Sequence, residues 1–114
     1  MPYTIHEEKV FQNTRDRVRD AVLAATSGLE GKVHKRNEEQ NTLTLRFHKT
    51  IHGQVLGDRT VFEIQLKDEN SGTLLAVDAY PVDAVYRKLM FGARKGVTKK
   101  VLSWFWAHVD HNLT

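Results

Sequence analysis

The feature that most constrains the fold is the spacing of apolar side chains between residues 32 and 80. Over this stretch apolar and polar residues alternate, most clearly in 42–48, 60–67 and 73–80. A period of two is the spacing of a strand that buries one of its faces. It predicts antiparallel strands with one face in a hydrophobic core and the other face in water.

Two further strands and the turns between strands complete the predicted sheet. A polar strand is expected over 32–37, at an edge, and a first strand over 3–11. The segments 38–41 and 68–72 carry polar residues and glycine, which suit tight turns. The stretch 50–59 contains two glycines and is either a loop or a bent extension of the neighbouring strands.

Residues 13–28 have the spacing of a helix. Asn13 or Thr14 can cap its first turn, and Asp16 lies where the helix dipole favours an anion. One apolar stripe is formed by Val18, Ala21, Val22, Ala25 and Leu29. We therefore expect this helix to pack on the sheet through that stripe and to end at the glycines that follow.

A second, longer helix is predicted over 83–112. Its inner stripe would consist of Val85, Leu89, Ala93, Val97, Val101, Trp104 and His108. Gly92 and Gly96 are four residues apart, a spacing that lets a helix approach a sheet closely. We therefore expect close packing of this helix on the sheet at the two glycines.

The predicted element order is β-α-β-β-β-β-α, in a single domain of residues 1–114. Runs of antiparallel strands with flanking helices define the α+β class. We expect a curved antiparallel sheet packed on a long C-terminal helix and a shorter N-terminal helix. The residues expected in the core are Leu43, Phe47, Phe62, Ile64, Val77 and Val97.

Composition excludes several classes of protein. The chain has no cysteine, so it contains no disulfide, no thiolate chemistry and no cysteine-based zinc site. It contains no run of about 20 apolar residues, so no membrane-spanning helix is expected. Its first eight residues lack the apolar region of a signal peptide. Together these observations predict a cytoplasmic protein.

Positive charge is concentrated near the C-terminus. Residues 83–114 hold six basic and two acidic residues, whereas residues 1–82 are close to neutral. The six basic residues are Arg87, Lys88, Arg94, Lys95, Lys99 and Lys100. On a helix they would form a band that binds an anionic partner such as nucleic acid, an acidic protein or a membrane surface. The alternative is a solvated helix face whose long stems cover apolar surface.

The segment 101–109 is apolar nearly all round, so one stripe cannot accommodate all of it. Its remaining side chains are expected to meet the first helix, a bound ligand or a second subunit in a homodimer.

Catalytic and metal-binding patterns are missing from the sequence. His108 and His111 can share one face of a helix, but a zinc site needs three or four ligands. No serine lies in a nucleophile elbow, and no glycine-rich phosphate loop occurs. We therefore predict a protein that is not an enzyme, with no metal and no cofactor.

One motif and the final helix carry a resemblance to known families. The sequence Gly-Gln-Val-Leu-Gly-Asp-Arg at 53–59 precedes a central strand, and the final helix holds a glycine, basic residues and late aromatics. With this element order, the chain resembles the TATA-binding-protein-like arrangement. It also resembles a shortened helix-grip domain of the START/polyketide-cyclase (SRPBCC-like) type and small bacterial proteins of that shape.

The helix-grip resemblance implies a function. Proteins of that type hold an apolar ligand between the sheet and the last helix, which implies ligand contacts at Phe62, Val77, Trp104 and Phe105. Two hypotheses follow: a small non-catalytic binding module for an apolar ligand, or an interaction protein whose basic C-terminal helix binds an anionic partner.

Overall fold

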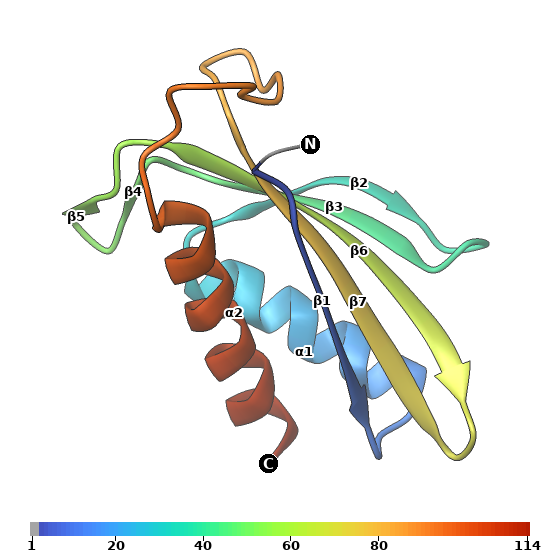
Figure 1. Cartoon of the computed structure of the whole chain (residues 1–114). Coiled ribbons are helices and arrows are strands. Elements are labelled where there is room, and N and C mark those ends of the chain that lie inside the picture. Colours follow the sequence, from blue (N-terminus) through green and yellow to red (C-terminus); the bar gives the residue numbers. More distant parts are fainter. Residues whose placement is uncertain (1–2) are drawn as a thin grey trace.

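The structure is a computed structural model and describes residues 3–114. Five strands form an antiparallel sheet in the order β1-β7-β6-β3-β2, and a separate pair is formed by β4 and β5. The sheet curves over two helices that lie on one of its faces (Figure 1). The elements are β1 (Ile5–Phe11), α1 (Arg15–Gly28), β2 (Lys32–Asn37), β3 (Thr42–Phe47), β4 (Thr50–Ile51), β5 (Gln54–Val55), β6 (Arg59–Glu69), β7 (Gly72–Val82) and α2 (Val97–Leu113). The predicted α+β class is confirmed.

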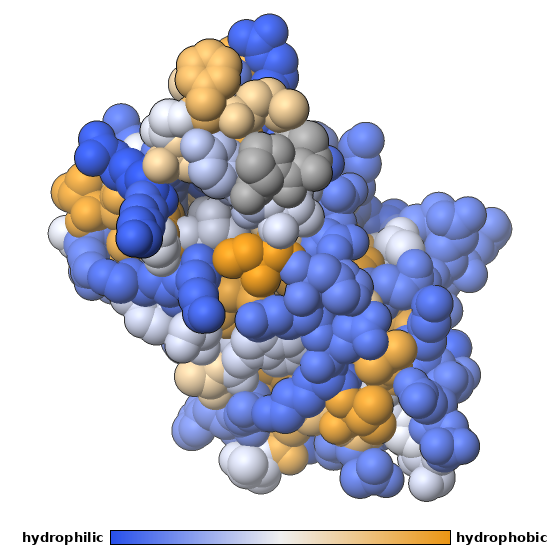
Figure 2. Space-filling view, viewed as in Figure 1, coloured by the Kyte–Doolittle hydropathy of each residue, from blue (hydrophilic) through white to orange (hydrophobic). Residues whose placement is uncertain are grey.

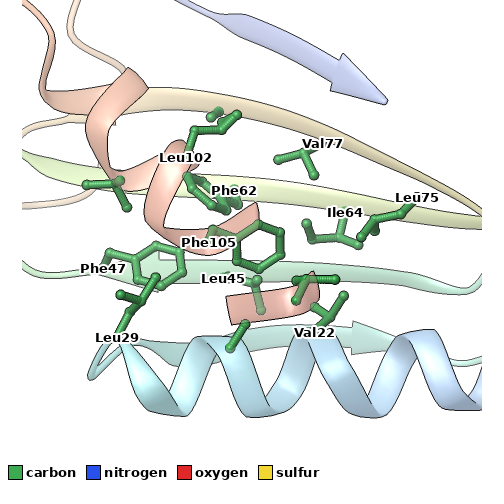
Figure 3. Packing of buried hydrophobic residues seen from close by; sticks show 14 of the residues in the cluster. Val22, Leu29, Leu45, Phe47, Phe62, Ile64, Leu75, Val77, Leu102 and Phe105 are labelled. Atoms are coloured by element: carbon green, nitrogen blue, oxygen red, sulfur yellow. The ribbon is translucent and has the colours of Figure 1, made fainter. Parts of the chain in front are cut away.

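The core lies between the sheet and the two helices. In the register of the sheet, Phe62 of β6 stands opposite Leu45 of β3 and Ala79 of β7, and all three side chains point toward the helices. Side chains of the sheet, such as Phe62, and of α2, such as Phe105, gather there (Figure 3). Burial of one such large apolar side chain contributes roughly 1.5–3 kcal/mol. All six residues predicted for the core are buried.

Helix α1 forms as its sequence predicts. The Thr14 hydroxyl accepts a hydrogen bond of 3.3 Å from the backbone N–H of Arg17, so Thr14 rather than Asn13 is the cap. The predicted apolar stripe of this helix is buried. After the helix, Glu30 adopts a φ of 61°, and a Cβ on Gly31 would lie 2.6 Å from the Phe47 ring. This glycine therefore lets the chain pass close to the core.

The stretch 50–59 contains a short hairpin over 50–55, and its last residue, Arg59, begins β6. Strands β4 and β5 pair through Thr50 with Val55 and through Ile51 with Gln54. His52 and Gly53 form the turn, both with positive φ (50° and 78°). The alternative left open by the sequence is thus settled as a separate hairpin, which projects beside α2 (Figure 1).

The prediction of a helix over 83–112 is wrong for its first 14 residues, because α2 begins at Val97. Positive φ values occur at Tyr86, Gly92 and Gly96, and such values are incompatible with a right-handed helix. Nothing lies within 4 Å of a Cβ built on Gly92 or Gly96. The expected close packing of a helix on the sheet at these glycines is therefore also wrong.

Residues 83–96, called here the 83–96 segment, instead fold over the outer face of the sheet. Lys88 forms a bridge with Val82, and the Leu89 N–H donates to the Pro81 carbonyl over 3.0 Å. Val61 and Val82 have outward-facing positions on β6 and β7, yet both are buried. The 83–96 segment covers this end of the outer face.

None of the helices within residues 3–114 is long and apolar enough to cross a membrane.

Candidate functional site

A hollow of about 310 Å³ lies where the end of α1, the β4–β5 hairpin and the middle of α2 meet. This hollow, called here the hairpin pocket, is lined by Leu29, Ile51, His52, Gln54, Trp104, Ala107 and His108. Its volume is at the lower end of the range of roughly 300–1,000 Å³ that ligand pockets occupy. It therefore suits a small molecule.

A close approach of the two helices forms one wall of the hairpin pocket. A Cβ built on Gly28 of α1 would lie 2.8 Å from Nδ1 of His108 on α2, so only a glycine allows this contact. Trp104 and Ala107 are one turn of α2 apart and face the same hollow. Because the Ala107 side chain is only a methyl group, the pocket stays open beside the Trp104 indole.

His52 attaches the hairpin to the end of α1. Its Nε2 lies 2.6 Å from the Gly28 carbonyl, and its backbone N–H donates to Oε1 of Glu30 over 2.7 Å. Because a carbonyl oxygen only accepts, Nε2 carries the proton in this bond. The His108 ring makes no hydrogen bond to another residue within 3–114, so its imidazole is free to bond a polar group of a ligand.

The four residues predicted to contact a ligand do not surround one cavity. Phe62, Val77 and Phe105 are fully buried, and the rings of Phe62 and Phe105 pack edge to face with centroids 5.1 Å apart. Trp104 alone of the four reaches the hairpin pocket. The space between sheet and final helix is filled by core side chains at these positions, and the hollow lies beside the helix instead.

The lining residues missed by the sequence analysis belong mainly to the hairpin and to the end of α1. Ile51, His52 and Gln54 lie in the stretch whose structure the sequence left open. Their contact with α2 depends on how the hairpin docks, and no local pattern encodes that docking. The two glycines of this stretch, Gly53 between His52 and Gln54 and Gly57 three residues further on, indicated a turn but not where the hairpin docks.

The six basic residues do not form a band on one helix. Arg87, Lys88, Arg94 and Lys95 lie on the 83–96 segment, whereas Lys99 and Lys100 lie on the first turns of α2. The Lys88 ammonium lies 4.5 Å from the centre of the Tyr80 ring, and that of Lys100 lies 5.9 Å from the Trp104 ring. That these residues bind an anionic partner stays a prediction, but they do not form the predicted band along one helix.

Three of the basic residues meet at a second hollow, of about 430 Å³, at the start of α2. Arg94, Lys95 and Lys99 line it, and its walls include the apolar side chains of Ile5 and Pro81. Gly96 is the N-cap of α2 and supplies no side chain to bond the first backbone N–H groups. The first turn of α2 also contains no acidic residue that would offset the positive charge at this hollow.

No group of three or more histidine, aspartate or glutamate side chains within residues 3–114 is arranged to hold a metal ion. The pair His108 and His111 does not gain a third ligand from these residues.

No protein-family model matches the sequence, and no curated protein matches it. Solved structures do match. The crystal structure of Ara h 8.0201 has a TM-score of 0.63 at 12% identity, with 97% of each chain covered. Ginseng major latex-like protein 151 from Panax ginseng has a TM-score of 0.49 at 8% identity, with 97% of each chain covered. A protein from Chromobacterium violaceum has a TM-score of 0.47 at 13% identity, covering 99% of this chain and 95% of that one.

At these identities the likeness concerns the fold. The match to Ara h 8.0201 extends over nearly the whole of both chains, and it supports the helix-grip part of the resemblance. The likeness to the TATA-binding-protein arrangement and a bacterial origin stay predictions. The chain therefore has the fold of that structure: a curved antiparallel sheet closed on a C-terminal helix.

Proposed function

We propose that this protein binds a small, largely apolar molecule in the hairpin pocket and does not transform it. The observation that carries the proposal is a hollow walled by the Trp104 indole, Leu29 and Ile51, with one available imidazole, His108, at its edge. Apolar walls with few polar groups are typical of small-molecule sites. The helix-grip resemblance implies the same kind of function, at a different place in the fold.

The lining of the pocket argues for binding rather than catalysis. It holds two histidines and no carboxylate, hydroxyl or lysine. One of these histidines, His52, already uses its Nε2–H on the Gly28 carbonyl. Nucleophilic catalysis needs a nucleophile with a base in hydrogen-bond reach, and the lining contains no such pair. The pocket supplies an aromatic wall at Trp104 and two polar groups, the His108 imidazole and the Gln54 amide, that can hydrogen-bond a ligand.

The test uses the two indole N–H signals of the protein in a two-dimensional NMR spectrum. Trp104 lines the pocket, whereas Trp106 points elsewhere and donates from Nε1 to Oε1 of Glu7 over 2.7 Å. Titration with a neutral aromatic probe, N-phenyl-1-naphthylamine, is expected to shift the Trp104 signal and leave the Trp106 signal in place. A Trp104→Phe variant assigns the two signals.

A pair of variants checks the location. Ala107→Leu adds a side chain inside the pocket and is expected to abolish probe binding, whereas Ala76→Leu adds the same side chain on the outer face of β7. Equal binding by both variants, or shifts confined to Trp106, would overturn the proposal. Native mass spectrometry of the purified protein then gives the mass of any molecule that it retains.

A homodimer through residues 101–109 stays a separate prediction. Val101, Leu102, Phe105 and Val109 are buried in the core of their own chain, and Trp106 packs on Phe11 with ring centroids 6.4 Å apart. Little apolar surface of this segment is left for a second subunit. The same native mass spectrum decides, because a dimer has twice the mass of the chain.

A further inference from the structure

The 83–96 segment carries three of the most exposed large apolar side chains within residues 3–114. Phe91 is 83% exposed, Val85 65% and Met90 54%. Single exposed apolar residues are normal on a folded protein, whereas neighbouring exposed apolar residues such as Met90 and Phe91 point to an interaction site. The segment forms the top of the molecule in Figure 1, and Figure 2 shows apolar residues gathered there beside hydrophilic ones.

The segment is held at its base and free at its tip. At one end, the Asp83 carboxylate accepts from the backbone N–H groups of Val85 and Arg87 over 2.9 and 3.0 Å. At the other end, the Arg94 N–H donates to Oδ2 of Asp58 over 2.6 Å. No atom lies within 4 Å of a Cβ built on Gly92. These contacts fix the base, so the apolar tip is directed away from the protein.

The charge of the segment is positive. It contains four basic residues and one acid, Asp83, which gives a net charge of +3. The Asp83 carboxylate accepts from the backbone N–H groups of Arg87 and Val85, which lower its pKa, and its Oδ2 lies 3.4 Å from Nε of Arg87. The three other basic residues of the segment, Lys88, Arg94 and Lys95, have no acidic side chain as an ion-pair partner within residues 3–114. Lys99 extends the basic surface from the first turn of α2. Basic residues therefore precede and follow the apolar tip along the chain, and Arg94, Lys95 and Lys99 gather at the start of α2.

We propose that the 83–96 segment docks on an anionic membrane surface, with Met90 and Phe91 entering the interface and the basic side chains meeting lipid head groups. Apolar residues flanked by lysine and arginine bind such surfaces by burying apolar area and by attraction to acidic lipids. This surface is separate from the hairpin pocket, so the proposal stands independently of ligand binding.

Two other occupants fit the segment less well. A symmetric dimer would place the segment against its own copy and bring like charges together. Single-stranded nucleic acid binds through aromatic faces, and in this region the Tyr80 and Tyr86 rings are already covered by Lys88 and Arg46. A membrane surface uses the aliphatic side chains Val85 and Met90 as well as Phe91.

The test is co-sedimentation of the full chain with phosphatidylcholine vesicles, with and without phosphatidylserine. Binding is expected only with phosphatidylserine and is expected to fall at high salt. Met90→Ser/Phe91→Ser should abolish this binding. Val10→Ser should not change it, because Val10 is an exposed apolar residue of β1 that pairs with Leu74 at the start of β7, whereas the 83–96 segment follows the end of β7. Since all three side chains are exposed, these variants should keep the unfolding midpoint of the parent protein.

A charge pair of variants and a spectroscopic signal complete the design. Arg87→Gln/Lys95→Gln is expected to weaken binding by about fivefold for each charge removed. Lys35→Gln/Lys67→Gln removes two exposed charges elsewhere and serves as the control. In a Trp104→Phe/Trp106→Phe background, Phe91→Trp should show a blue shift of fluorescence on acidic vesicles. No vesicle binding at low salt, equal loss in both charge variants, or binding of an oligonucleotide without vesicle binding would overturn the proposal.

Discussion

His6 lies between two carboxylates on the outer face of the sheet. Its Nδ1 is 2.6 Å from Oδ1 of Asp78, and its Nε2 is 2.8 Å from Oε2 of Glu8. Both ring nitrogens can donate only when the imidazole is protonated. The hydrogen bond to Glu8 and then that to Asp78 therefore raise the pKa of His6 above its usual value of 6.5.

This pair of contacts gives a pH prediction. Because the folded-state pKa of His6 is raised, its stabilising contribution is complete below about pH 6.5 and is lost as the pH rises through the folded-state pKa. An NMR titration of the ring protons should give a pKa above 6.5 for His6. In Asp78→Asn one partner is neutral, and the pKa should fall.

A matched variant separates this effect from a general change in charge. Asp20→Asn removes an acid from α1, outside the contacts of His6, and is expected to leave the His6 titration unchanged. The same pKa in the parent protein and in Asp78→Asn would contradict the assignment of the raised pKa to these hydrogen bonds.

At the scale of an element, the end of β1 is set by its approach to the start of β7. A Cβ built on Gly72 would lie 2.2 Å from the carbonyl oxygen of Phe11, and a backbone atom cannot move aside as a flexible side chain can. Gly72→Ala is therefore expected to lower the free energy of unfolding by roughly 1–3 kcal/mol. Urea denaturation measures the change.

Gly53 provides the comparison for this prediction. A Cβ there would meet nothing within 4 Å, but the φ of 78° strains any other residue. Gly53→Ala should cost about 1–2 kcal/mol through backbone strain alone. If Gly72→Ala left the stability of the protein unchanged, β1 would not be held as closely against β7 as the structure describes.

At the scale of the whole molecule, Phe105 joins the layers. Its ring packs on Phe62 of the sheet and lies 5.8 Å from the Trp106 ring of its own helix. Phe105→Ala opens a cavity between the sheet and α2 and is expected to cost about 3–5 kcal/mol. Phe91→Ala removes the same side chain from an exposed position and should change the free energy of unfolding by less than about 0.5 kcal/mol. Similar losses in the two variants would contradict this division between core and surface.

The local pattern of the sequence was sufficient for the strands of the sheet, for α1 and for most of the core, but it did not predict the strand order. Alternation identifies the buried face of each strand because successive side chains of a strand point to opposite faces. The stripe and cap of α1 lie within one segment, so their signal is also local. Of the four ligand contacts implied by the helix-grip resemblance, only Trp104 lines the pocket, and no local pattern of the sequence distinguished it from the others.

Tertiary contacts decided the rest. Val85, Leu89 and Ala93 have helical spacing in the sequence, but the bond from Leu89 to Pro81 and that from Arg94 to Asp58 hold the segment in another conformation. These hydrogen bonds join the segment to residues outside it, whereas a helical periodicity depends only on the spacing of residues within one segment. The hairpin pocket exists only because β4–β5 docks beside α2, and hydrogen bonds from His52 to Gly28 and Glu30 fix that docking. Sequence patterns therefore determined which side chains are buried, whereas long-range hydrogen bonds and packing determined where the chain leaves a hollow and where it exposes an apolar tip.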